Sequence, residues 1–227
     1  MPERHHLTGL EAVAGRRSVR QFLADPVSLE TVRELLDLAA RSPSGTNVQP
    51  WNVHVVVGAA RERVTSEVLQ DVQAGLGSDE YPYAPRPWRE PFVGRRCRFG
   101  FDLYAKYGIE RDNMAGRAAA ILRNYSFFGA PVGLFFTMDR DHLYGAWLDM
   151  GMFMQTVMIV ARSFGLETCP QELWCHYVPA IRRAISIPEE QILVCGMALG
   201  YEDVSAECNT LVTTREPAER FATFHLE

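Results

Sequence analysis

Hydrophobic residues recur every three or four positions in parts of this chain, and this spacing predicts amphipathic helices. The clearest case is the stretch 28–40, where Ser28 stands at the position of a helix N-cap. Its apolar stripe consists of Val32, Leu35, Leu36 and Ala39. By the same reasoning we expect helices over 60–74 and 112–125, and short apolar runs predict strands over 52–58, 130–138 and 192–200.

The stretch 143–161 is almost entirely apolar and is about as long as a bilayer-spanning helix requires. It nevertheless contains Asp149 near its middle and also Gln155. A helix that is apolar on all sides is equally typical of a protein core or of a dimer interface. We therefore expect a buried helix in a soluble protein, and no membrane contact.

The stretch 75–96 contains four prolines and several aromatic residues, so it cannot form one regular element. With few strands, more helix and no strict alternation of the two, the pattern indicates an α+β fold. No GxGxxG motif follows the first strand, so a dinucleotide-binding βαβ unit is not supported.

Composition, charge and cysteine spacing exclude several classes of protein. The 227 residues can bury a substantial core, and a formal charge of −5, from 23 basic and 28 acidic residues, argues against non-specific nucleic-acid binding. The first thirteen residues lack the apolar core of a signal peptide. Five cysteines without CxxC spacing indicate free thiols in a reducing compartment, so we expect a cytoplasmic protein. The six histidines lack ligand spacing, so no metal site is assigned.

Three arginines and a serine fall within five positions at Arg16, Arg17, Ser18 and Arg20. One interpretation is a solvated charged turn at the end of a helix. The other is a phosphate clamp, because guanidinium groups bind phosphate oxygens in pairs and a hydroxyl adds another bond. The distant Arg215 is a candidate for the same anion.

A loop rich in turn-forming residues follows as SPSGTNVQPW, residues 42–51. Its candidate positions are Pro43, Ser44, Gly45 and Asn47. Small donors and backbone freedom suit the close approach of a planar polar ring, but an ordinary connecting turn has the same composition.

Together, RRSVRQF (16–22) and SPSGTNVQPW resemble the opening of the nitroreductase family of FMN enzymes. Further similar segments follow in family order at 127–136, 149–171, 185–189 and 194–201. This resemblance covers nearly the whole chain. It implies a single domain over 1–227 with an α+β nitroreductase-like fold, in which helices flank a central mixed or antiparallel sheet. It also implies an intertwined homodimer with a long central helix and with flavin at the subunit interface.

The resemblance assigns FMN contacts to four groups of residues. The cluster at 16–20 and Arg215 match positions that hold the phosphate and ribityl end, and the loop positions named above match a segment that the other subunit contributes. The backbone segment along the flavin ring edge matches Pro170, Gln171, Glu172 and Leu173, and Asn124 matches a further flavin contact. The family often has glycine where this chain has Leu173, and lysine where it has Thr213. These differences suggest a bulkier, more apolar wall and a different charge balance at the phosphate.

An insertion over about 75–123 precedes Asn124, and the chain ends in an extension over about 205–227. The insertion is either a solvated excursion or a lid over the flavin. As a lid, it offers rings for stacking on an aromatic substrate and arginines for a carboxylate. These candidates are Tyr83, Trp88, Phe92, Arg95, Arg96, Phe99 and Tyr104. The pattern is similar to that of family members that reduce nitrobenzoates.

The resemblance implies a ping-pong reaction in which NADH or NADPH reduces FMN and a nitroaromatic compound then reoxidises it by two electrons. The flavin carries the chemistry, so no side chain is assigned as acid or nucleophile, and the backbone near Glu172 tunes the ring. Other reactions of the same fold stay open: reduction of enones, quinones or halogenated aromatics, and flavin fragmentation. A flavin-binding protein without turnover is the alternative from another class.

Overall fold

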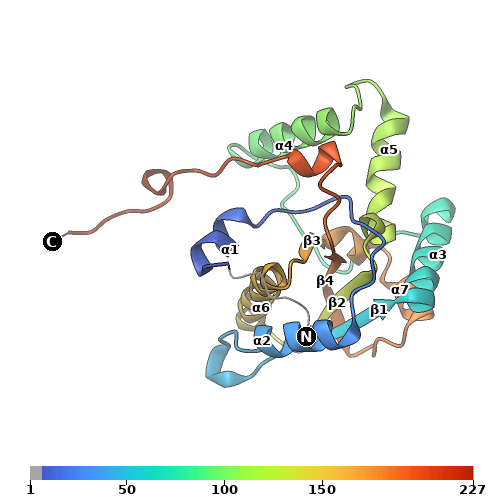
Figure 1. Cartoon of the computed structure of the whole chain (residues 1–227), viewed down its shortest axis with the longest axis horizontal. Helices are drawn as coiled ribbons and strands as arrows, with labels where there is room; N and C mark the ends of the chain where they lie inside the picture. The colour runs from blue at the N-terminus through green and yellow to red at the C-terminus, as the bar shows by residue number, and fades with distance from the viewer. Residues whose placement is uncertain (1–6, 227) are drawn as a thin grey trace.

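A four-stranded antiparallel sheet forms the centre of the computed structural model, which describes residues 7–226. Its strands are β1 (Asn52–Val57), β2 (Val132–Asp139), β3 (Glu167–Gln171) and β4 (Gln191–Gly200). They lie in the order β1-β2-β4-β3 (Figure 1). One isolated parallel bridge joins Ser18 to Thr168 beside β3. The predicted α+β class and the flanked sheet are confirmed, with the sheet antiparallel rather than mixed.

Helices cover both faces of the sheet. The helices α2 (Leu29–Ala39) and α6 (Tyr144–Ser163) pack on one face, and α3 (Gly58–Ala74) and α7 (Val178–Ala184) pack on the other (Figure 1). Side chains alternate along β2, so Leu134 and Phe136 join the core on the α2–α6 side while Phe135 joins the other core. Burial on both faces explains why β2 is one continuous apolar run.

The long apolar stretch forms α6, which buries Met150, Phe153, Val157 and Ala161 against the sheet and α2. Within residues 7–226, no helix is both long and apolar enough to cross a membrane. The interpretation of this stretch as a packed helix is therefore confirmed.

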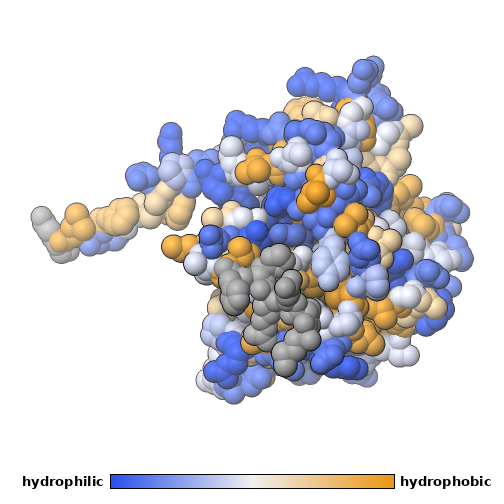
Figure 2. Space-filling model, in the orientation of Figure 1, coloured by the Kyte–Doolittle hydropathy of each residue, from blue (hydrophilic) through white to orange (hydrophobic). Residues whose placement is uncertain are grey.

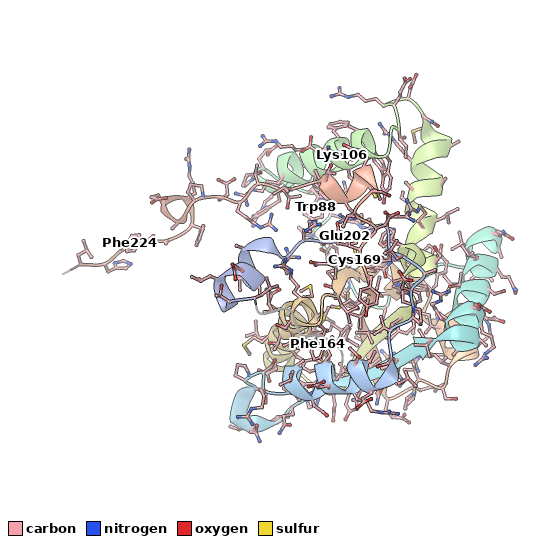
Figure 3. The ribbon with its side chains drawn as sticks, viewed as in Figure 1. Trp88, Lys106, Phe164, Cys169, Glu202 and Phe224 are labelled. Carbon is pink, nitrogen blue, oxygen red and sulfur yellow. The ribbon has the colours of Figure 1, made fainter. Side chains whose placement is uncertain are left out.

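Two helices stand apart from the sheet. These are α4 (Phe92–Lys106) and α5 (Met114–Leu122), which lie at the top of Figure 1. No residue of either helix is fully buried, and both lie wholly within the described part of the chain. From Pro217 onward the chain runs along exposed residues away from the body as a tail that contains Phe224 (Figures 1 and 3). This tail carries both hydrophilic and hydrophobic side chains (Figure 2).

The sequence expectations for the regular elements need four additions. The structure contains β3, α1 (Gly9–Gly15), α4 and α7, which the hydrophobic pattern did not predict. The irregular segment expected over 75–96 ends at Pro91, and α4 begins at its last five residues. The helix expected over 112–125 is shorter, because a 3-10 segment, η2 (Arg123–Gly129), replaces its end.

Candidate active site

The cationic segment 16–20 lies in extended conformation between α1 and the edge of the sheet. Val19 and Phe22 are buried in the core, and the Val19 amide donates to the Thr168 carbonyl at 3.1 Å. With these two apolar side chains fixed, Ser18 and Arg20 on either side of Val19 stay partly exposed. The spacing of apolar and basic residues thus fastens the segment to β3 and presents its polar side chains.

Glu202 and Asn209, which the sequence analysis did not single out, hold this segment in place. The Arg17 guanidinium donates to both carboxylate oxygens of Glu202 and, through Nε, to the Asn209 carbonyl at 3.1 Å. The buried Asn209 side chain accepts from the Arg20 amide at 2.8 Å and donates to the Gln21 carbonyl at 2.8 Å. Arg17 is therefore engaged in fixing the segment, which leaves Arg16 and Arg20 as its candidates for an anion, with one Arg20 nitrogen already donating to the Ser18 carbonyl at 3.1 Å.

A first hollow, which we call the phosphate hollow, brings the two ends of the chain together. It is lined by Arg16, Arg17, Ser18 and Arg20 together with Thr213, Thr214 and Arg215. Burial and the nearby Arg215 lower the pKa of Arg16, because both disfavour its charge. Thr213 accepts from Arg215 at 2.7 Å and so orients its guanidinium. An anion bound between Arg16 and Arg215 would relieve their repulsion, and a phosphate suits this donor set.

The segment expected at the flavin ring edge comprises the end of β3 and the short η3 (Glu172–His176). The buried Gln171 amide donates to the Asn124 carbonyl at 2.8 Å and accepts from the Trp174 indole at 3.3 Å. Trp174 fits because Gly196 has no side chain: a Cβ there would lie 2.2 Å from the indole ring. Burial raises the pKa of Glu172. The core thus fixes the backbone of 170–173.

A second hollow, the α4–α5 hollow, continues from the first. It shares Arg20 and Phe99 with the phosphate hollow and is closed at its other side by Asn124 and Leu173. Its lid-side walls come from Arg96, Tyr104, Tyr107 and Arg117. A third hollow, the edge hollow, shares Arg96 and Leu173 with the second, so the three hollows adjoin in one groove.

The candidate substrate residues divide among these hollows. Tyr83 and Trp88 line the edge hollow with Glu172 and His176, and Tyr104 lines the α4–α5 hollow. Phe99 and Arg96 stand at the two junctions. Arg95 lines the phosphate hollow and pairs with Glu216 at 3.1 Å. Phe92 is exposed beneath Arg95, at 5.9 Å, and lines none of the three hollows.

The loop 43–47 is held far from this groove in the single chain. Its Gly45 amide donates to both oxygens of the buried Asp149 on α6 at 3.2 Å, and Thr46 and Asn47 adopt positive φ values of 50° and 61°. Of the described residues that line the three hollows, none belongs to this loop. Its assignment to the flavin of another subunit stays a prediction.

All five cysteines are free, and four of them are buried. Within the described residues, no group of histidine, cysteine and acidic side chains is placed to hold a metal ion. The arginines at one end of the groove suit a ligand with an anionic end.

Comparison with known proteins identifies the class. The model of the nitroreductase family matches residues 13–201, and the chain belongs to this family. A 4-nitrobenzoate reductase from Nocardioides sp. (strain LMS-CY) is 42% identical over 216 residues, covering 93% of this chain and 87% of the relative. A chloronitrobenzene nitroreductase from Comamonas testosteroni is 39% identical, covering 94% and 95%.

Solved structures agree. The FMN and NADPH-dependent nitroreductase NfnB from sphigopyxis sp. strain HMH superposes with a TM-score of 0.95 at 37% identity, covering 97% of this chain and all of that chain. The FMN-dependent NfnB from Mycobacterium smegmatis, solved in complex with NADPH, superposes with a TM-score of 0.90 at 31% identity, covering 95% and 96%. The resemblance in the sequence and the expected fold are thereby confirmed.

Proposed function

We propose that this protein is an FMN-dependent oxidoreductase that reduces nitroaromatic compounds with NADH or NADPH. The observation that carries the proposal is the groove, which runs from a cluster of arginines to a backbone segment fixed by the core and then to aromatic side chains of the lid. Its order matches a ligand with a phosphate at one end and a planar ring at the other. The names of the similar nitroreductases agree with this chemistry.

The residues present fit FMN. Arg16, Ser18, Arg20 and Arg215 would hold the phosphate, and the backbone of 170–173 with Asn124 would border the ring. When bound, FMN supplies a ring that accepts a hydride from the nicotinamide and passes two electrons to the nitro group. The chain itself positions the ring edge and shields the site with the lid.

The lid supports aromatic substrates. Tyr83, Trp88 and Tyr104 offer ring faces for stacking, and Arg96 stands between the α4–α5 and edge hollows with its guanidinium 5.6 Å from the Trp88 ring. An arginine so placed favours a carboxylate on the substrate. We therefore include nitrobenzoates among the substrates, and we treat residues 75–123 as the lid of a single domain.

The exposed face of α6 supports a homodimer. Tyr144, Leu148 and Met152 are spaced by four residues and are 89%, 71% and 40% exposed, so they form one apolar stripe. Asp149, next to this stripe, anchors the loop 43–47. A partner that covers the stripe would therefore meet the loop, as an intertwined dimer with shared flavin sites requires. The free thiols favour a cytoplasmic location.

The first experiment is the visible spectrum of the purified protein, before and after anaerobic addition of NADH or NADPH. We expect flavin bands that bleach and that return when 4-nitrobenzoate or nitrobenzene is added. Return with other acceptors only, such as quinones or enones, would retain the reductase and refute the substrate class. Bands that never bleach would indicate flavin binding without turnover, and a protein that takes up no FMN would refute the proposal.

The dimer is tested by placing a charge in the stripe. We expect Leu148→Glu to give a monomer in light scattering and to weaken FMN binding at least tenfold, because a buried unpaired carboxylate opposes association. The matched control is Leu76→Glu, which adds the same charge at an exposed leucine beyond α3, on the other face of the sheet. A monomeric wild type, or equal effects of both variants, would exclude this interface.

A further inference from the structure

The α4–α5 hollow has an unusual charge for this protein. Its described walls carry Arg20, Arg96 and Arg117 and no aspartate or glutamate, although the chain as a whole has a formal charge of −5. A concave, partly apolar surface lined by one sign of charge concentrates ligands of the opposite sign. The flavin phosphate does not account for this charge, because Arg96 and Arg117 lie outside the phosphate hollow.

Two residues that line this hollow each carry a buried polar atom without a hydrogen-bond partner among the described residues. These atoms are the Tyr107 hydroxyl and the Arg117 Nε. Buried donors of this kind are rare in folded proteins, and each one calls for an explanation such as a ligand or a bound water. Both residues line the same hollow, which makes them joint candidates for contact with one ligand.

The surroundings keep both groups in a donating state. The Arg117 guanidinium stacks on the Tyr104 ring at 5.2 Å, and Arg117 has no ion-pair partner among residues 7–226. Burial raises the pKa of Tyr107 to about 12, so its hydroxyl keeps its proton at neutral pH. The nearby Cys208 thiol also raises the pKa of Tyr107, but its position does not meet the geometry of a hydrogen bond to the hydroxyl.

The separation between Arg117 and the ring-edge segment limits which ligands can contact both. Arg117 lies on α5, seven residues before Asn124, which corresponds to roughly 10 Å along a helix axis. Asn124 and Leu173 close the hollow at the ring-edge segment. A ligand that reaches both ends must therefore carry its anionic group well away from the atom that reacts at the flavin.

We propose that Arg117 and Tyr107 form an oxyanion subsite that recognises a ligand by an anionic group remote from its reacting end. The inference rests on the proposed function, because the other end of the hollow is the expected flavin edge. Two sources have the required chemistry: the carboxylate of an aromatic acid and the 2′-phosphate of NADPH. Both offer oxygens that accept from a guanidinium and a phenol at once.

The test compares two pairs of probes that differ only in the anionic group: benzoate with benzamide, and NADP⁺ with NAD⁺. Their binding to the oxidised, FMN-loaded protein is followed by calorimetry and by the flavin absorbance. In the wild type we expect the anionic member of at least one pair to bind more tightly. In Arg117→Gln this preference should fall by roughly 10- to 100-fold, and Arg117→Lys should keep part of it. The pair that responds identifies the source.

Arg111→Gln is the matched control, since it removes the same charge from an exposed lid arginine that stacks on Phe101 at 4.4 Å and does not line the hollow. We expect it to leave both preferences within about twofold. Tyr107→Phe gives a second test: it should weaken binding of the anionic probe while leaving the melting temperature equal or higher, because it removes an unpartnered buried hydroxyl.

Equal losses in Arg117→Gln and Arg111→Gln would overturn the proposal in favour of a general charge effect. A wild type without preference in either pair, or preferences that survive Arg117→Gln, would also overturn it. These outcomes are separable from failure of the proposed function, because the wild-type protein would still bind FMN and lose its flavin absorbance with NADH or NADPH.

Discussion

Two tryptophans show how differently the two walls of the groove are built. Trp174 behind the ring edge is fully buried, with Phe127 at 4.4 Å and Phe135 at 5.3 Å. Trp88 in the lid is only half-buried, and the Arg96 guanidinium lies over its ring at 5.6 Å. The scaffold that we propose to position the cofactor is thus fixed by the core, whereas arginine–aromatic contacts near the surface hold the proposed lid. A wall of the second kind can change its residues, and hence its ligand, at little cost in stability.

The largest expected effect is on the stability of the scaffold. Trp174→Ala should lower the free energy of unfolding by about 3–5 kcal/mol, because it leaves a cavity among aromatic rings that cannot collapse fully. Trp88→Ala should cost less than about 1 kcal/mol, in line with a half-exposed side chain. Urea unfolding of both variants, with absorbance and circular dichroism as probes, measures the difference. Equal losses would mean that the lid belongs to the cooperative core, which would remove the distinction between the two walls.

The next effect separates cofactor binding from structure within one cluster. Arg16→Gln should weaken FMN binding by roughly 10- to 100-fold and leave stability nearly unchanged, because its guanidinium lies free in the phosphate hollow. Arg17→Gln should instead lower stability by about 1–3 kcal/mol, because it leaves the largely buried Glu202 carboxylate without its partner. FMN titration by fluorescence quenching and thermal unfolding of the apoprotein distinguish the two.

The reverse pattern, with Arg17→Gln losing FMN at unchanged stability, would show that Glu202 releases Arg17 to the phosphate. Glu202→Gln is the control for this outcome. It keeps an acceptor for Arg17, so it should lower the free energy of unfolding less than Arg17→Gln does. It should leave FMN affinity unchanged.

The sequence predicted some elements of the fold and missed others, depending on how clear their local pattern is. Elements with a clear period, such as α2 and β1, were found close to their true bounds. The strand β3 was missed because Pro170 interrupts a short run with no alternation, and α4 was missed because it begins inside a proline- and arginine-rich stretch. Local pattern carries no information about such elements when tertiary contacts determine them.

The residues of the candidate site also differ in whether the sequence could predict them. The cluster 16–20 was visible because its residues are adjacent in sequence. Glu202 and Asn209 were not, since their partner Arg17 lies 185 and 192 residues away. Arg117 and Tyr107 were also missed, because an isolated arginine on a helix and a tyrosine at a helix end are ordinary surface features until folding buries their polar atoms and places both residues in the wall of one hollow.

The smallest perturbation uses the cysteines as reporters of the two walls. Burial raises the pKa of Cys195 to about 12 and also raises the pKa of Cys169 and Cys175, all in the scaffold, whereas Cys97 is exposed on α4. The thiolate is the reactive form, so a thiol reagent should modify one cysteine per native chain. Raising the pH from 7 to 9 should speed that reaction without recruiting Cys195, since a thiol with a pKa of 12 is only about one thousandth ionised at pH 9.

Cys97→Ser should abolish labelling of the native protein without changing stability, and all five thiols should react in denaturant. Labelling of a scaffold cysteine in the native chain would mean that the ring-edge wall opens in solution, and the contrast between a fixed scaffold and an adjustable lid would then fail where the flavin is expected to bind.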